Sequence, residues 1–114
     1  MRELVEALNR AGFHVNAYAL RHRNKKRLVS DLLRKREYRL AAEVALVFQH
    51  RDKEQWASIL KGYIHDGNNA KLKGLLKTVK NITELWVIPE FATAWLKVSE
   101  EQPEFKNMCP IPLT

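Results

Sequence analysis

The stretch RLAAEVALVF, residues 39 to 48, decides the fold class of this chain. It is apolar at nearly every position, and a buried helix or a buried strand produces such a run, because periodicity alone does not separate the two. Its alanines favour a helix, since alanine has the highest helix propensity. The segments before and after it also have helical patterns. We therefore predict a central buried helix here.

Working outward toward the N-terminus, the pattern predicts further helices. Apolar residues recur at helical spacing in the first ten positions, and Gly12 follows where a C-terminal cap belongs. Asn16 is a candidate N-cap for a second helix. A third segment, residues 26–35, has an apolar stripe and an otherwise cationic face. The stripe consists of Leu28, Val29, Leu32 and Leu33.

Toward the C-terminus, helix start and stop signals are equally frequent. Asp52 and Gln55 are spaced as a capping box, and the helix that they begin is expected to end at Gly67. Asn69 opens another helix. Pro89 should kink or break the last apolar pattern, because proline lacks the amide hydrogen that a helix interior needs.

These elements together predict an all-α fold. We expect six to seven short helices arranged as antiparallel helical hairpins in an α-solenoid-like, right-handed array. The predicted domain is a single helical-repeat domain over residues 1–101. Residues 102–114 contain three prolines and are predicted to form an extended tail.

Composition excludes several protein classes. No apolar run approaches the roughly 18–20 residues that a membrane-spanning helix requires, so no membrane span is predicted. The N-terminus lacks the features of a secretory signal. An intracellular location, cytoplasmic or nuclear rather than secreted, is therefore expected. Cys109 is the only cysteine, which rules out an internal disulfide.

Catalytic motifs find no support in the sequence. His14, His22, His50 and His65 have no spacing that forms a metal-binding pair on one helix face. No strained Gly-x-Ser-x-Gly turn and no phosphate-cradling glycine loop is present. The chain is therefore predicted not to be an enzyme, with no cofactor, no metal site and no catalytic residue.

Charge is concentrated in one segment. Residues 21–39 hold nine basic and two acidic side chains, an excess equal to the whole net charge of +7. A cationic helix face can neutralise several phosphates, with affinity driven by counterion release. The predicted nucleic-acid-binding residues of this segment are Arg21, Arg23, Lys25, Lys26, Arg27, Arg34, Lys35, Arg36 and Arg39. A second basic ridge is predicted at Lys71, Lys73 and Lys77, with Lys80 beyond them.

Residues 56–72, WASILKGYIHDGNNAKL, resemble part of a pentatricopeptide repeat. In that family a first helix with a leucine, a glycine and an aromatic residue precedes a glycine turn, as Leu60, Gly62, Tyr63 and Gly67 do here. Residues 28–48 match a second repeat more loosely, and tetratricopeptide and trafficking-type α-solenoid repeats share the same hairpins. The resemblance implies a helical-repeat, α-solenoid-like protein. No residue is assigned to a base-reading code.

The leading hypothesis is a non-catalytic helical-repeat module that binds RNA through its basic patch, within a larger RNA-processing or RNA-regulating protein. The alternative is a protein-interaction scaffold of the membrane-trafficking α-solenoid type that docks an acidic partner. A solvated helix face or a nuclear-import sequence at residues 21–27 also remains open. Trp56, Trp86 and Trp95 are interpreted as core residues rather than base-stacking platforms.

Overall fold

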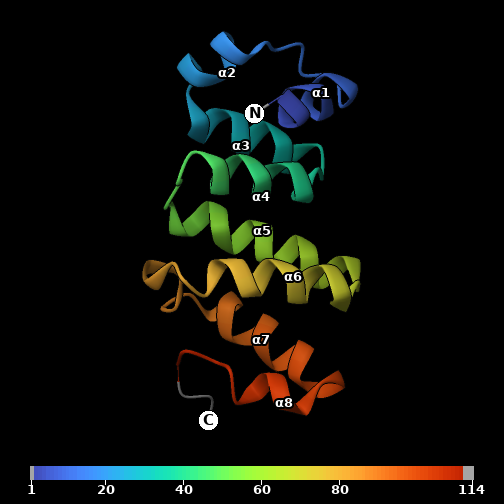
Figure 1. Cartoon of the computed structure of the whole chain (residues 1–114), viewed down its shortest axis with the longest axis vertical. Coiled ribbons are helices and arrows are strands. Elements are labelled where there is room, and N and C mark those ends of the chain that lie inside the picture. Colours follow the sequence, from blue (N-terminus) through green and yellow to red (C-terminus); the bar gives the residue numbers. More distant parts are fainter. Residues whose placement is uncertain (1, 112–114) are drawn as a thin grey trace. The chain divides into compact units, whose positions relative to one another are not determined.

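The computed structural model describes residues 2–111 and is all-helical over that range. This confirms the all-α prediction. The described residues form eight α-helices and one short 3-10 helix and contain no strand, where six to seven helices were predicted (Figure 1). The helices are α1 (Arg2–Arg10), α2 (Ala17–His22), α3 (Lys25–Arg34), α4 (Tyr38–Val47), α5 (Lys53–Asp66), α6 (Asn69–Val79), η1 (Thr83–Leu85), α7 (Pro89–Glu101) and α8 (Pro103–Lys106).

The chain divides into two compact units. Unit 1 ends at Asp52 and contains α1 to α4, and unit 2 begins at Lys53 and contains α5 to α8. The single domain predicted over residues 1–101 spans this boundary and stays a prediction.

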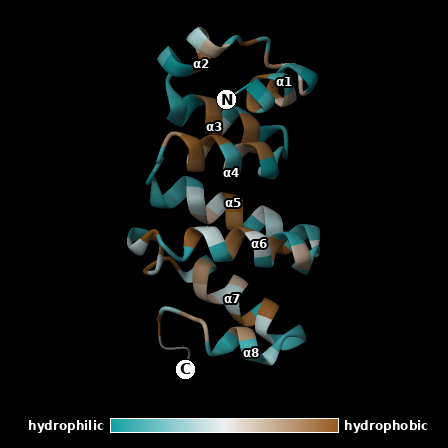
Figure 2. Cartoon of the chain, in the orientation of Figure 1, coloured by the Kyte–Doolittle hydropathy of each residue, from teal (hydrophilic) through white to brown (hydrophobic). Residues whose placement is uncertain are grey.

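Helix α4 occupies the centre of unit 1. It packs against both α1 and α3, which explains why its sequence is apolar nearly all round. Leu40, Val44 and the alanines of α4 are buried, and apolar residues of α3 and α4 are brown in Figure 2. The prediction that RLAAEVALVF is a buried helix is therefore confirmed. Small alanine side chains let neighbouring helices approach a helix that is covered on several sides.

Two helix ends in unit 1 have the same hydrogen-bonded turn. After α1, the Gly12 amide donates to Asn9 O (3.0 Å) and the Phe13 amide donates to Leu8 O (2.9 Å). This is the Schellman arrangement, which places a residue with positive φ after the helix. Gly12 has that conformation, with φ of +93°. The predicted C-terminal cap at Gly12 is confirmed.

The basic stretch at residues 21–27 spans a junction between two helices. Helix α2 ends at His22 and α3 begins at Lys25. The Asn16 side chain accepts from the Ala19 amide (2.7 Å), as predicted for an N-cap. Asn24 caps α3 in the same way, accepting from the Arg27 amide (3.1 Å). Asn24 therefore divides the basic stretch into two differently oriented parts.

Unit 2 is organised around α7, which packs against α5, α6 and α8. The break predicted near Pro89 is confirmed, since η1 ends at Leu85 and α7 begins at Pro89. Trp56 and Trp95 are fully buried, which confirms the interpretation of these two as core residues.

The tail predicted to be extended over residues 102–114 instead begins with a helix. Pro103 is the first residue of α8, a position that suits proline because the amide at a helix start has no partner within the helix. Phe105 of α8 is fully buried and stacks on Trp95, with ring centroids 4.4 Å apart. The buried aromatic pair gives α8 a reason to fold back onto α7.

Along residues 2–111, no helix combines the length and the apolar character that crossing a bilayer demands.

Candidate anion-binding site

Lys25 lies at the centre of the predicted basic patch but points inward. Its ammonium donates to two main-chain carbonyls, Arg21 O and Arg23 O, both at 2.7 Å. The same nitrogen lies 4.4 Å from the centroid of the Phe48 ring. Burial lowers the pKa of Lys25 below its ordinary value of 10.5, because desolvation disfavours the charged form. Lys25 therefore ties α2, α3 and the end of α4 together.

Two further cations of the predicted patch have carboxylate partners on the same unit. The Lys26 ammonium lies 3.3 Å from an Asp52 carboxylate oxygen. The Arg39 guanidinium lies 3.4 Å from Glu43, one helical turn along α4. Exposed ion pairs of this kind contribute little stability, but they lower the positive potential that a ligand meets.

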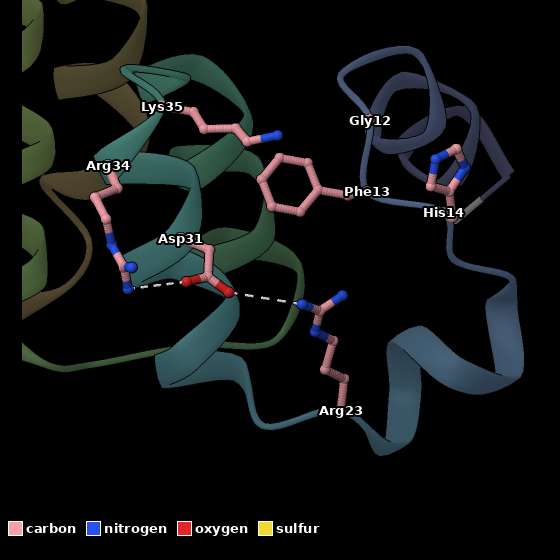
Figure 3. A pocket seen from close by; sticks show the side chains of 7 residues that line it. All are labelled: Gly12, Phe13, His14, Arg23, Asp31, Arg34 and Lys35. Atoms are coloured by element: carbon pink, nitrogen blue, oxygen red, sulfur yellow. Dashed lines mark hydrogen bonds and ion pairs between the residues drawn. The ribbon is translucent and has the colours of Figure 1, made fainter.

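A hollow of about 390 Å³ in unit 1 gathers three of the predicted cations (Figure 3). We call it the α3 hollow. It lies between α3 and the turn that follows α1, and Arg23 enters it from the junction before α3. Its lining residues are Gly12, Phe13, His14, Arg23, Asp31, Arg34 and Lys35.

Asp31 joins the two arginines of the hollow. One of its carboxylate oxygens accepts from Arg34 Nη2 at 3.0 Å, and the other lies 3.6 Å from Arg23 Nη2 (Figure 3). The Arg34 side chain is 76% exposed and that of Arg23 is 34% exposed. Arg34 is consequently the more accessible of the two guanidinium groups.

Lys35 and Phe13 form the opposite side of the hollow. The Lys35 ammonium lies 4.7 Å from the centroid of the Phe13 ring, a cation–π contact, and Phe13 is only 8% exposed. Lys35 is the residue that ends α3. The turn after it repeats the arrangement seen after α1, with the Glu37 amide donating to Leu32 O (2.9 Å) and Arg36 at φ of 60°.

The sequence predicted only part of this site. Arg23, Arg34 and Lys35 were predicted from charge, whereas Phe13, His14 and Asp31 were missed. Asp31 stands three residues before Arg34, a helical spacing that brings opposite charges together and was a usable signal. The position of Phe13 depends on the fold of the turn after α1, which charge patterning does not reveal.

Other predicted residues lie outside the hollow. Arg21, Arg27 and Arg36 are exposed on unit 1 but do not line it. Lys71, Lys73 and Lys77 belong to α6 in unit 2, where Lys73 donates to the Gln102 side-chain oxygen. A continuous basic edge that joins both sets stays a prediction.

A second hollow, of about 350 Å³, lies in unit 2 between α5 and α7. Lys61 and Glu90 face each other there, with a nitrogen to oxygen distance of 3.9 Å. Opposite charges of equal number leave no excess to attract an ion. Among residues 2–111, no three His, Cys, Asp or Glu side chains come close enough together to hold a metal ion.

Comparison with known proteins gives one match. A family model described as the Rough deal protein C-terminal region matches residues 22–110. No curated protein and no solved structure matches the chain. The match overturns the predicted pentatricopeptide and tetratricopeptide-like assignment, which is wrong. Apolar helices separated by glycine turns are common to many helical families, so the pattern at residues 56–72 was not specific to those repeats.

Proposed function

The chain belongs to the family of the Rough deal protein C-terminal region, and on that premise we propose that it is a non-catalytic interaction module of a mitotic, kinetochore-related protein. The α3 hollow of unit 1 docks an acidic segment of a protein partner. The alternative function predicted from the sequence, an interaction scaffold for an acidic partner, is thereby preferred over RNA binding.

One observation carries this proposal. Arg23, Arg34 and Lys35 converge on a single recess that also contains a largely buried aromatic ring. Protein interfaces are enriched in arginine and aromatic side chains, and such anchors occupy pockets. A recess with cations and one apolar wall therefore suits an acidic side chain together with its aliphatic stem.

RNA binding is the second candidate, and the exposed Arg21, Arg27 and Arg36 favour it. Binding of single strands relies on a basic groove that follows the backbone, with aromatic rings on which bases stack. In unit 1, Lys25 is turned toward main-chain carbonyls, and Lys26 has a carboxylate neighbour. These arrangements interrupt the basic surface at the helix junction, which lowers its match to a continuous strand.

We also propose that the helices build a solenoid-like array of antiparallel hairpins, the finer part of the fold prediction. Its support is local. Helices α3 and α4 pack together after a short turn, and α5 and α6 pack together after a turn at residues 67–68. Helix pairs joined by short turns are the units from which α-solenoids are stacked.

The docking proposal is tested by fluorescence anisotropy with a labelled glutamate-rich peptide and a labelled oligouridylate RNA at low salt. Arg34→Gln removes a cation of the hollow, and Arg27→Gln makes the same change on α3 outside it. We expect the peptide to bind, and Arg34→Gln to weaken it about tenfold, because a charge-assisted hydrogen bond is lost. Arg27→Gln should weaken it only about twofold, as for an exposed charge.

Two results would overturn the proposal. Failure of the peptide to bind at low salt removes the docking surface. Equal weakening by both variants, combined with tighter binding of the RNA, transfers the function to RNA. Circular dichroism of each variant verifies that its helices are intact.

A further inference from the structure

We propose that the α3 hollow recognises a phosphorylated serine or threonine side chain on the acidic partner. This inference rests on the proposed docking function and names the chemical group that the hollow selects. A phosphomonoester carries a charge of about −1.5 to −2 at neutral pH, whereas a carboxylate carries −1 and an RNA phosphodiester carries −1.

The first support is the charge of the hollow. Arg23, Arg34 and Lys35 contribute three positive charges, and the carboxylate of Asp31 removes one. The surplus of two positive charges equals the charge of a phosphomonoester dianion. A single carboxylate would leave half of that surplus without a counter-charge.

The second support is the arrangement of donors. Asp31 holds one guanidinium at each of its two oxygens, so both arginines approach the hollow in fixed positions. Each guanidinium has five N–H donors and uses few of them on Asp31, which leaves others for phosphate oxygens. Arginine matches phosphate geometry through paired hydrogen bonds. Lys35 supplies a third donor group from the end of α3.

Asp31 also sharpens the selection. Its carboxylate repels every anion that enters, and the C-terminal ends of α1 and α3 beside the hollow carry partial negative charge. The attraction therefore comes from the cationic side chains alone. A dianion gains about twice as much from them as a monoanion does, so it overcomes this repulsion more readily.

The hollow also has an apolar contact for the stem of the bound residue. At about 390 Å³ it is larger than one carboxyl group needs, and the edge of Phe13 contributes an apolar wall. The carbon atoms of phosphoserine, or the methyl group of phosphothreonine, can pack there while the phosphate meets the cations.

The test uses the full chain and three matched short peptides whose central residue is phosphoserine, glutamate or serine between glycines and glutamates. Isothermal titration calorimetry should give the phosphoserine peptide at least about tenfold tighter binding than the glutamate peptide, the gain of roughly one charge-assisted hydrogen bond. Binding of the phosphoserine peptide should weaken below about pH 6, where the phosphate gains its second proton.

Variants locate the binding. Arg34→Lys keeps the charge but loses the paired donors, and Lys35→Gln removes the third cation. Each should remove most of the preference for phosphoserine over glutamate, whereas Arg27→Lys on the same helix should leave that preference unchanged. Both hollow positions are exposed, so the fold should persist, and circular dichroism checks this.

The outcomes separate the two proposals. Equal affinity for the phosphoserine and glutamate peptides overturns the phosphate selection and leaves docking of an acidic partner intact. No binding of either peptide overturns both. A phosphoserine preference that survives Arg34→Lys and Lys35→Gln places the phosphate elsewhere and overturns this assignment of the hollow.

Discussion

Asn9 and Val15 exchange two hydrogen bonds. Asn9 Nδ2 donates to Val15 O at 2.8 Å, and the Val15 amide donates to Asn9 Oδ1 at 3.0 Å. The side chain of Asn9 thus acts like a neighbouring strand for the chain segment after α1. This contact fixes the turn that contains Gly12 and Phe13, and so one wall of the α3 hollow.

Replacing Asn9 by alanine should affect both stability and binding. Loss of the two part-buried hydrogen bonds should lower the free energy of unfolding by about 1–3 kcal/mol. The wall containing Phe13 should also become mobile, so the glutamate-rich peptide should bind several-fold more weakly. Urea denaturation and fluorescence anisotropy measure the two effects.

Asn68→Ala is the matched control for Asn9→Ala. Asn68 caps α6 in unit 2, where it accepts from the Lys71 amide (3.1 Å), and its loss should cost about 1 kcal/mol. Peptide binding should not change in this variant. If Asn9→Ala also leaves binding unchanged, the turn after α1 does not shape the binding surface.

Lys25→Met should destabilise the junction between α2 and α3. The thioether side chain keeps much of the apolar stem but removes the donor that serves Arg21 O and Arg23 O. We expect a loss of about 1 kcal/mol in the free energy of unfolding, measured by urea denaturation. Lys77→Met, at an exposed position of α6, should change it by less than about 0.5 kcal/mol. Equal effects of the two variants would show that Lys25 is an ordinary surface lysine.

The contribution of Lys25 should also depend on pH. Because its pKa in the folded chain is lowered below 10.5, the folded chain binds fewer protons there than the unfolded chain between those two values. The cost of holding a desolvated ammonium is fully present below the folded pKa and is relieved as the pH rises through it.

This linkage is measured by comparing the native chain with Lys25→Met. The free energy of unfolding of the native chain, minus that of the variant, should increase as the pH rises from neutrality toward 10.5. A difference that decreases over this range would mean that the carbonyl contacts raise the pKa instead.

Phe105→Ala should strongly destabilise unit 2. Phe105 is fully buried against Trp95, whose indole nitrogen also donates to Phe105 O at 2.9 Å. Removal of a buried aromatic side chain costs about 3–5 kcal/mol, which thermal or urea unfolding would detect. Met108→Ala, at a residue that is 44% exposed, is the control. A small effect of Phe105→Ala would indicate that α8 is not part of the core.

Much of the fold was predictable because it depends on local patterns. The alanine-rich run at residues 39–48, the Asn16 cap and the break at Pro89 each have a local physical cause that the sequence displays. Helix α8 was missed because its stability comes from Phe105 meeting Trp95 in space. A proline-containing segment without periodicity gives no sign of such a contact.

The candidate site was less predictable than the fold. Charge counting found the basic segment, but it could not show that Lys25 turns toward Phe48 or that Asp31 lies between Arg23 and Arg34. Those contacts depend on the change of direction between α2 and α3. The family assignment was wrong for a related reason, because helical hairpins have the same apolar spacing in unrelated families.

The central claim is that an acidic partner docks in the α3 hollow. The most direct measurement is a titration of the 15N-labelled chain with the glutamate-rich peptide, followed by two-dimensional NMR of main-chain and arginine side-chain N–H groups. We predict saturable shifts centred on Gly12, Phe13, Arg23, Arg34 and Lys35, with no change on α6. Shifts centred on Lys71 and Lys77, shifts spread over all exposed cations, or no shifts at all would contradict the account.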